Sequence, residues 1–441
     1  MEFLVGGVAL ALGLWLSWGL PALPMTLGLL SVAVRPELIL GGALGQLDWG
    51  LARSLLVLGL LINAIRYGVR RQANWPIAAL LAVLVLSLAL GNPHPRLTPL
   101  LMLTGLAVLA LPWAFTSVVL APGSRRGYAA LIAVLPLLSA AFGILAGFAE
   151  PTPTWGFSGS FDGVYRFGGA SRNAEPFAIL AFAGFAVALH EASRPGRPYA
   201  GWLAFVNLVL VILSGTRMAI LAAAVLLVVY GSLSQELREA VLRRRWLAVS
   251  AAVALAATVL LYWHSLQLRL FEGDSDSINL SKRDDVWGFY LDEFLLSPLF
   301  GRGLGIAYVA GADWLTGLWR TTPHNEYLHL LVAGGAVGGL LCLAAIALWY
   351  RQLLQTASDN DRLFLLALAP ALGLYALTAD LLIYWSGLGL FAYLGIILTR
   401  ARALAPLPLP RAAPVEQPRA APVEQEAAPA TRRAALFRPE P

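Results

Sequence analysis

Long uninterrupted apolar segments constrain the fold of this chain more than any other feature. A helix needs about 20 mostly apolar residues to cross a bilayer, with a working range of about 17–25. Because backbone groups inside a bilayer must be paired within the chain, such segments predict spanning helices. We therefore expect an all-α polytopic membrane protein. The clear candidate spans are 76–91, 97–120, 129–148, 176–190, 200–214, 217–233, 247–263, 328–349, 363–379 and 382–399.

The composition leads to the same fold class. Of the 441 residues, 59% are hydrophobic and only 13% are charged, whereas a soluble chain has roughly 25% charged residues. These figures exclude a water-soluble fold, a nucleic-acid-binding protein and a disulfide-rich secreted scaffold. Prolines and charges interrupt residues 1–66, which hold either two broken spans or four short ones. Two broken spans would bring the total to roughly twelve.

Arginines predict the orientation of the spans. Lys and Arg in short loops are retained in the cytoplasm, and arginines occur in alternate loops of this chain, for example Arg66, Arg125, Arg194, Arg238 and Arg351. This pattern predicts that both termini are cytoplasmic. The longest loops on the opposite side, 149–175 and 264–327, are then periplasmic.

The larger of these loops contains a predicted helix. Ser281 can cap its amino end, and an apolar face follows, formed by Val286, Trp287, Tyr290, Leu291 and Phe294. A helix with this pattern is expected to lie along the membrane interface.

The composition changes after residue 400. Ala, Pro, Glu and Arg dominate there, and the heptapeptide RAAPVEQ at 411–417 is repeated at 419–425. Such a segment cannot bury a core. We therefore expect a transmembrane catalytic domain over 1–400 and a disordered cytoplasmic tail over 401–441.

A second group of basic residues lies on the predicted outer side, where loop charge does not explain it. Each residue alone could extend to the lipid headgroups or pair with an acid such as Glu175. Several arginines together suit a lipid-linked diphosphate, because guanidinium groups form charge-assisted hydrogen bonds with it. The group comprises Arg166, Arg172, Arg217, Arg269, Lys282, Arg283, Arg302 and Arg320.

His324 stands where the large loop enters a span, within the sequence TTPHNEYLHLL. A histidine there is either an interfacial hydrogen-bonding residue or a proton acceptor at a site facing the loop. The other histidines are scattered, and His329 does not share a helix face with His324 as an i,i+4 ligand pair would. We therefore expect no metal site and no cofactor.

Three motifs together resemble the O-antigen ligase family, within a wider group that includes O-antigen polymerases and protein O-oligosaccharyltransferases. They are the PHNEYL element around His324, the GRGLG run at 301–305 and the SGTR sequence ending at Arg217. The resemblance extends from about Arg166 to Tyr393. The first 150 residues share only hydropathy with the family.

The resemblance implies a metal-independent, GT-C-type glycosyltransferase in the bacterial inner membrane. Such an enzyme transfers O-antigen glycan from undecaprenyl diphosphate to lipid A-core at the periplasmic face, in lipopolysaccharide biosynthesis. It implies that His324 is a general base or orients the acceptor. It also places Arg217 and Arg283 near the donor diphosphate, with Arg166 or Arg172 as an addition.

Supporting roles follow from the same resemblance for Asn325, Gly301, Gly303 and Gly305, and Asp380 is a further candidate because it is an acid at the outer end of a span. Asp380 either orients a catalytic group or pairs with an arginine. An O-antigen polymerase, which uses the same donor, is the alternative to a ligase. A secondary transporter is disfavoured, because the charges collect at one surface and no internal repeat precedes the tail.

Overall fold

The computed structural model describes residues 20–34, 45–70, 74–121, 125–148, 157–159, 165–171, 173–243, 283–308, 322–379, 381 and 387–404, with single residues at 249, 253, 256 and 260. Residues 1–402 form one compact unit and 403–441 a second. The tail predicted over 401–441 lies, apart from the end of the last helix, outside the described residues.

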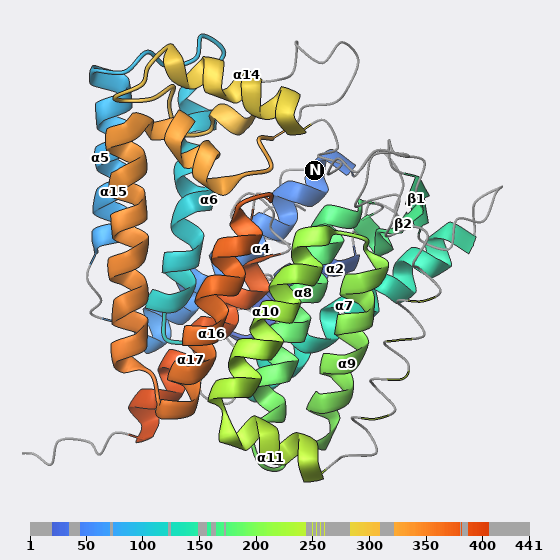
Figure 1. The fold of residues 1–441 in the computed structure, drawn as a ribbon. Coiled ribbons are helices and arrows are strands. Elements are labelled where there is room, and N and C mark those ends of the chain that lie inside the picture. Colours follow the sequence, from blue (N-terminus) through green and yellow to red (C-terminus); the bar gives the residue numbers. More distant parts are fainter. Residues whose placement is uncertain are drawn as a thin grey trace, which may run out of the picture. The chain divides into compact units, whose positions relative to one another are not determined.

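The described part of the first unit is built almost entirely of helices (Figure 1). Two short antiparallel strands, β1 (Phe157–Gly159) and β2 (Tyr165–Phe167), and two 3-10 turns, η2 (Gly169–Ser171) and η3 (Ile306–Tyr308), accompany them. The helices are α2 (Leu23–Val34), α4 (Gly45–Tyr67), α5 (Trp75–Ala89), α6 (Pro99–Ser117), α7 (Arg125–Phe148), α8 (Ala174–Ala192), α9 (Pro198–Leu213), α10 (Arg217–Leu233), α11 (Gln235–Arg243), α14 (Arg283–Leu295), α15 (Glu326–Thr356), α16 (Asp359–Ala376) and α17 (Leu388–Leu404).

These helices confirm the polytopic membrane class. Within the described residues, α6, α7, α8 and α15 are long and apolar enough to cross a bilayer, and six further apolar helices are shorter. Most predicted spans coincide with a helix. The segment 247–263 lies almost entirely outside the described residues.

Helix α8 is the most deeply buried element, and its sequence explains why. It is apolar all round, as expected for a helix with no solvent-facing stripe, and every residue from Phe177 to Ala192 is buried. It packs against α7, α9 and α10, which surround it in Figure 1. Its first turn carries Glu175, so the packing holds this carboxylate on a rigid element.

Helix α14 confirms the helix predicted in the large loop. It packs against α15 and lies across the ends of α5 and α15 in Figure 1. Val286 and Tyr290 are buried in a cluster with residues of α5 and α15. Leu291, which the sequence placed on the same apolar face, is 47% exposed, because only part of that face meets the neighbouring helices.

Helix α15 is broken at Gly335, where the backbone takes φ +66°. The carbonyls of Val332 and Ala333 therefore lose their usual helical donors. The loop after α14 supplies replacements, since the N–H groups of Arg302 and Gly303 donate to them at 2.8 and 2.9 Å. In return, the N–H groups after the break donate to Pro298 and Leu299 at 2.8 and 3.1 Å.

This exchange explains the glycine-rich run. Gly301, Gly303 and Gly305 are buried and all have positive φ. A Cβ on Gly301 would lie 2.3 Å from the Ala333 carbonyl oxygen, so no larger residue fits without moving backbone. The described contacts of these glycines thus include both close backbone packing and backbone hydrogen bonds.

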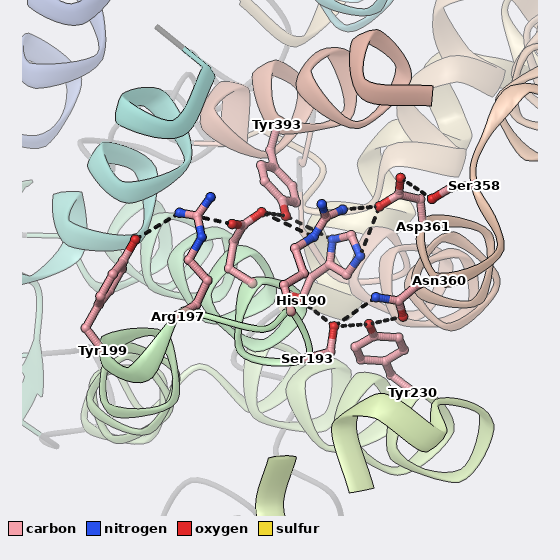
Figure 2. Close-up of polar contacts among 11 residues, drawn as sticks. His190, Ser193, Arg197, Tyr199, Tyr230, Ser358, Asn360, Asp361 and Tyr393 are labelled. Atoms are coloured by element: carbon pink, nitrogen blue, oxygen red, sulfur yellow. Dashed lines mark hydrogen bonds and ion pairs between the residues drawn. The ribbon is translucent and has the colours of Figure 1, made fainter. Parts of the chain in front are cut away.

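A buried polar network holds the carboxyl-terminal end of α8 (Figure 2). His190 Nε2 lies 3.2 Å from Asp361 Oδ1 on α16, and Arg194 pairs with the same carboxylate. Tyr393 on α17 donates to Glu191 Oε1 at 2.6 Å. The network therefore joins α8 to α16 and α17, far along the helix from Glu175.

We expect Asp361→Asn to destabilise the protein. Removing the charge leaves Arg194 and His190 facing a neutral group in a mostly buried site, at a cost of about 2–3 kcal/mol once the partial exposure of Arg194 is considered. The midpoint of thermal unfolding in detergent should fall clearly. Asp359→Asn, an exposed neighbour on the same helix turn, is the control, and equal midpoints for the two variants would contradict the role assigned to the network.

Candidate functional site

His324 is held between α14 and α15. The indole Nε1 of Trp287 on α14 donates to the Pro323 carbonyl at 2.9 Å. On the other side, the Asn325 side chain accepts from the Leu328 N–H at 3.0 Å and so caps α15. The residues on either side of His324 are thus fixed by hydrogen bonds to two different helices.

The backbone of His324 is strained. Its φ is +47°, and it is the one non-glycine residue with positive φ among the described residues. Such a conformation costs on the order of 1–3 kcal/mol and persists only where the surroundings enforce it. The contacts of Trp287 and Asn325 supply that enforcement, and strain of this kind is concentrated at functional sites.

The imidazole of His324 faces a carboxylate. Its Nδ1 lies 3.2 Å from Glu175 Oε2, with 20% and 17% of the two side chains exposed. Thr322 Oγ1 is 3.5 Å from the same nitrogen, which is at the limit for a hydrogen bond. From sequence, Glu175 was a possible arginine partner. Its pairing with His324 links residues 149 positions apart, and no local pattern could reveal it.

Arg166 and Arg217 meet at the turn between α9 and α10. Arg166 on β2 donates from Nε to the Ser214 carbonyl at 3.0 Å and from Nη2 to Thr216 Oγ1 at 2.7 Å. Thr216 is the N-cap residue of α10, and Arg217 is the first residue of this helix. Arg166 thereby fastens the turn that positions Arg217.

These groups gather at one end of the helices. Helix α9 connects α8 to α10, and all three pack on one another, so α8 and α10 run in the same direction. Glu175 and Arg217 therefore begin neighbouring helices at the same end, and His324 joins them through Glu175. The structure thus brings these residues to the same end of the helices.

The other predicted site residues have different outcomes. Arg302 is buried, and its Nε lies 2.8 Å from Glu293 Oε2. Pairing with an acid, the alternative named above for each outer arginine, therefore explains this residue. Arg283 is the first residue of α14, although its side chain is outside the described part. Arg172 and Asp380 lie outside the described residues.

An apolar cavity of about 290 Å³ begins at the first turn of α15, two residues after His324. Glu326 and Tyr327, which follow Asn325 in the chain, form part of its wall, and the rest of the wall comes from α5, α6, α15, α16, α17 and Leu381. The Glu326 carboxylate is 3.1 Å from Nδ1 of buried His329, so its charge has a partner. A mostly apolar wall with a polar end suits an amphipathic ligand.

Among the described residues, no group of three or more His, Cys, Asp or Glu side chains is arranged to hold a metal ion. The chemistry available at the site is that of an imidazole, a carboxylate and guanidinium groups. Together they can accept a proton and stabilise an anion.

The fold and the site define a class of protein: a multi-pass helical membrane protein with a strained histidine at one end of its helices. The family model described as O-antigen ligase matches residues 202–343, from α9 to the middle of α15. This match shows that the chain is related to the O-antigen ligase family. Comparison with curated protein sequences gave no match.

The matched region contains Arg217, the glycine-rich run and His324. Members of the family are membrane enzymes of the glycosyltransferase type that act in surface-glycan assembly, as ligases or polymerases. Glu175 and Arg166 precede the matched region, so the match covers only part of the site.

Proposed function

We propose that this protein is an O-antigen ligase of the bacterial inner membrane. It transfers glycan from undecaprenyl diphosphate to lipid A-core in lipopolysaccharide biosynthesis, without a metal or nucleotide. The site lies on the periplasmic face, and both termini are cytoplasmic. The proposal rests on the family relationship together with the arginines and the histidine at one end of the helices, and on the apolar cavity whose wall begins in the first turn of α15.

The observation that carries the proposal is the strained His324, which is followed in the chain by Glu326 and Tyr327 in the wall of an apolar cavity. A lipid-linked sugar diphosphate has a charged head and a long apolar tail. The cavity, about 290 Å³, is at the small end of ligand pockets, so it would receive the part of the tail nearest the diphosphate. The head would then lie at the helix ends, near His324 and Arg217.

The reaction follows from the groups at that end. His324 accepts the proton of the acceptor hydroxyl as its oxygen attacks the anomeric carbon. The bond from that carbon to the diphosphate oxygen breaks on the opposite face, so the linkage is inverted. Arg217 and Arg283 stabilise the negative charge that develops on the diphosphate as it leaves.

Purified protein in detergent, with undecaprenyl-diphosphate glycan and lipid A-core, tests the proposal directly. Without nucleotide or metal, the lipid A-core should shift to higher mass. Longer lipid-linked glycan and unchanged lipid A-core would instead indicate a polymerase. A glycosyl diphosphate without a polyprenyl tail should be a much poorer donor, because it leaves the cavity empty.

A further inference from the structure

We infer that Glu175 is the positioning residue for His324: its carboxylate fixes the proton on Nδ1 and leaves Nε2 as the proton acceptor. The inference rests on the proposed transfer reaction and adds to it a residue from α8. This helix lies before the region that the O-antigen ligase family model matches.

The proton assignment follows from the chemistry of the two partners. An ionised carboxylate has only acceptor oxygens, whereas a neutral imidazole has one N–H donor and one unprotonated nitrogen that accepts. At 3.2 Å from Glu175 Oε2, Nδ1 must therefore carry the hydrogen. The unprotonated nitrogen is then Nε2, on the side of the ring away from the carboxylate.

The amino terminus of α8 stabilises the charge of Glu175, and the packing of this helix fixes its position. It lies in the first turn of α8, where the exposed N–H groups and the helix dipole favour a negative charge. The Asn173 side chain caps this helix by accepting from the Glu175 N–H at 3.1 Å. The rest of α8 is buried, and the polar network around Asp361 holds its far end.

The pair has a defined task in the displacement. The acceptor O–H bond breaks and its proton moves to Nε2, while the acceptor oxygen forms the new bond to the anomeric carbon. The bond between that carbon and the diphosphate oxygen breaks, and its electron pair leaves with the diphosphate. The imidazolium formed in this step is stabilised by the Glu175 charge.

Glu175→Ala and Glu175→Gln separate this role from a structural one. In the purified transfer assay, Glu175→Ala should lower kcat on the order of 100-fold, with KM for both substrates within about threefold, because the pair acts on proton transfer and not on binding. Glu175→Gln keeps an acceptor oxygen but loses the charge, so its kcat should lie between those of wild type and Glu175→Ala. Glu236→Gln, an exposed neutralisation on α11, is the control with unchanged kcat.

A second readout does not depend on activity. The chain holds five histidines, and His324→Ala identifies the His324 signals in ¹⁵N-histidine NMR spectra. Wild type should show Nδ1 protonated and Nε2 bare, and Glu175→Ala should show a mixture of the two tautomers.

The outcomes distinguish the two proposals. If wild type transfers glycan and Glu175→Ala keeps full kcat, the positioning role is overturned and the proposed function stands. If wild type transfers no glycan, the proposed function fails, and the spectra alone decide the pairing. A His324 tautomer that is the same in wild type and Glu175→Ala would overturn the inference in either case.

Discussion

His324→Ala is expected to lower glycan transfer by about 100- to 10,000-fold, the usual range for loss of a general base. The imidazole is a titratable group just before the start of α15, and its Nδ1 lies 3.2 Å from Glu175 Oε2. Without it, the acceptor hydroxyl keeps its proton and attacks the anomeric carbon poorly. The effect should appear in kcat, measured with purified protein at saturating donor.

The matched control is His94→Ala. His94 is half-buried in the loop between α5 and α6, where its backbone N–H donates to the Arg302 carbonyl. This variant should keep wild-type kcat. A well-expressed His324→Ala protein that still modifies lipid A-core at the wild-type rate would refute the base assignment.

Arg217→Lys should lower kcat/KM for the donor by roughly 10- to 100-fold. Lysine keeps the charge but loses the planar fork that binds a diphosphate with two parallel hydrogen bonds. Each charge-assisted bond contributes roughly 1.5–3 kcal/mol, and 1.4 kcal/mol corresponds to about tenfold. Arg166 holds the turn before Arg217 in place. The backbone there cannot shift to bring a lysine ammonium to the positions of the lost guanidinium N–H groups.

Arg351→Lys tests whether any arginine replacement has this effect. Arg351 is exposed near the carboxyl-terminal end of α15, at the opposite end of the helix from His324, and its kcat/KM should be unchanged. Equal activity of Arg217→Lys and wild type would remove the argument for a guanidinium clamp at the diphosphate.

Much of the fold could be predicted from the sequence. The apolar segments marked most of the described helices, with 217–233 matching the bounds of α10, because bilayer thickness and backbone pairing allow little else. The helix beginning at Arg283 was also predicted, since its apolar spacing is a local property.

Three features of the fold could not be predicted, because each depends on contacts between distant segments. The apolar run after His324 indicated one continuous helix, but α15 breaks at Gly335 to receive the loop at 298–303. The glycine-rich run packs against that break, and no local pattern indicated this contact. His190 had no predicted role, and it lies in a buried network with Asp361.

The sequence by itself determined the membrane class, most of the helices and the candidates His324 and Arg217, because length, hydropathy and short motifs are encoded locally. Only the tertiary structure decided what these candidates contact. The pairing of His324 with Glu175 and the fastening of the Arg217 turn by Arg166 depend on how α8, α10 and α15 pack. Side-chain partners 48 to 149 residues apart are set by that packing and leave no periodic trace in the chain.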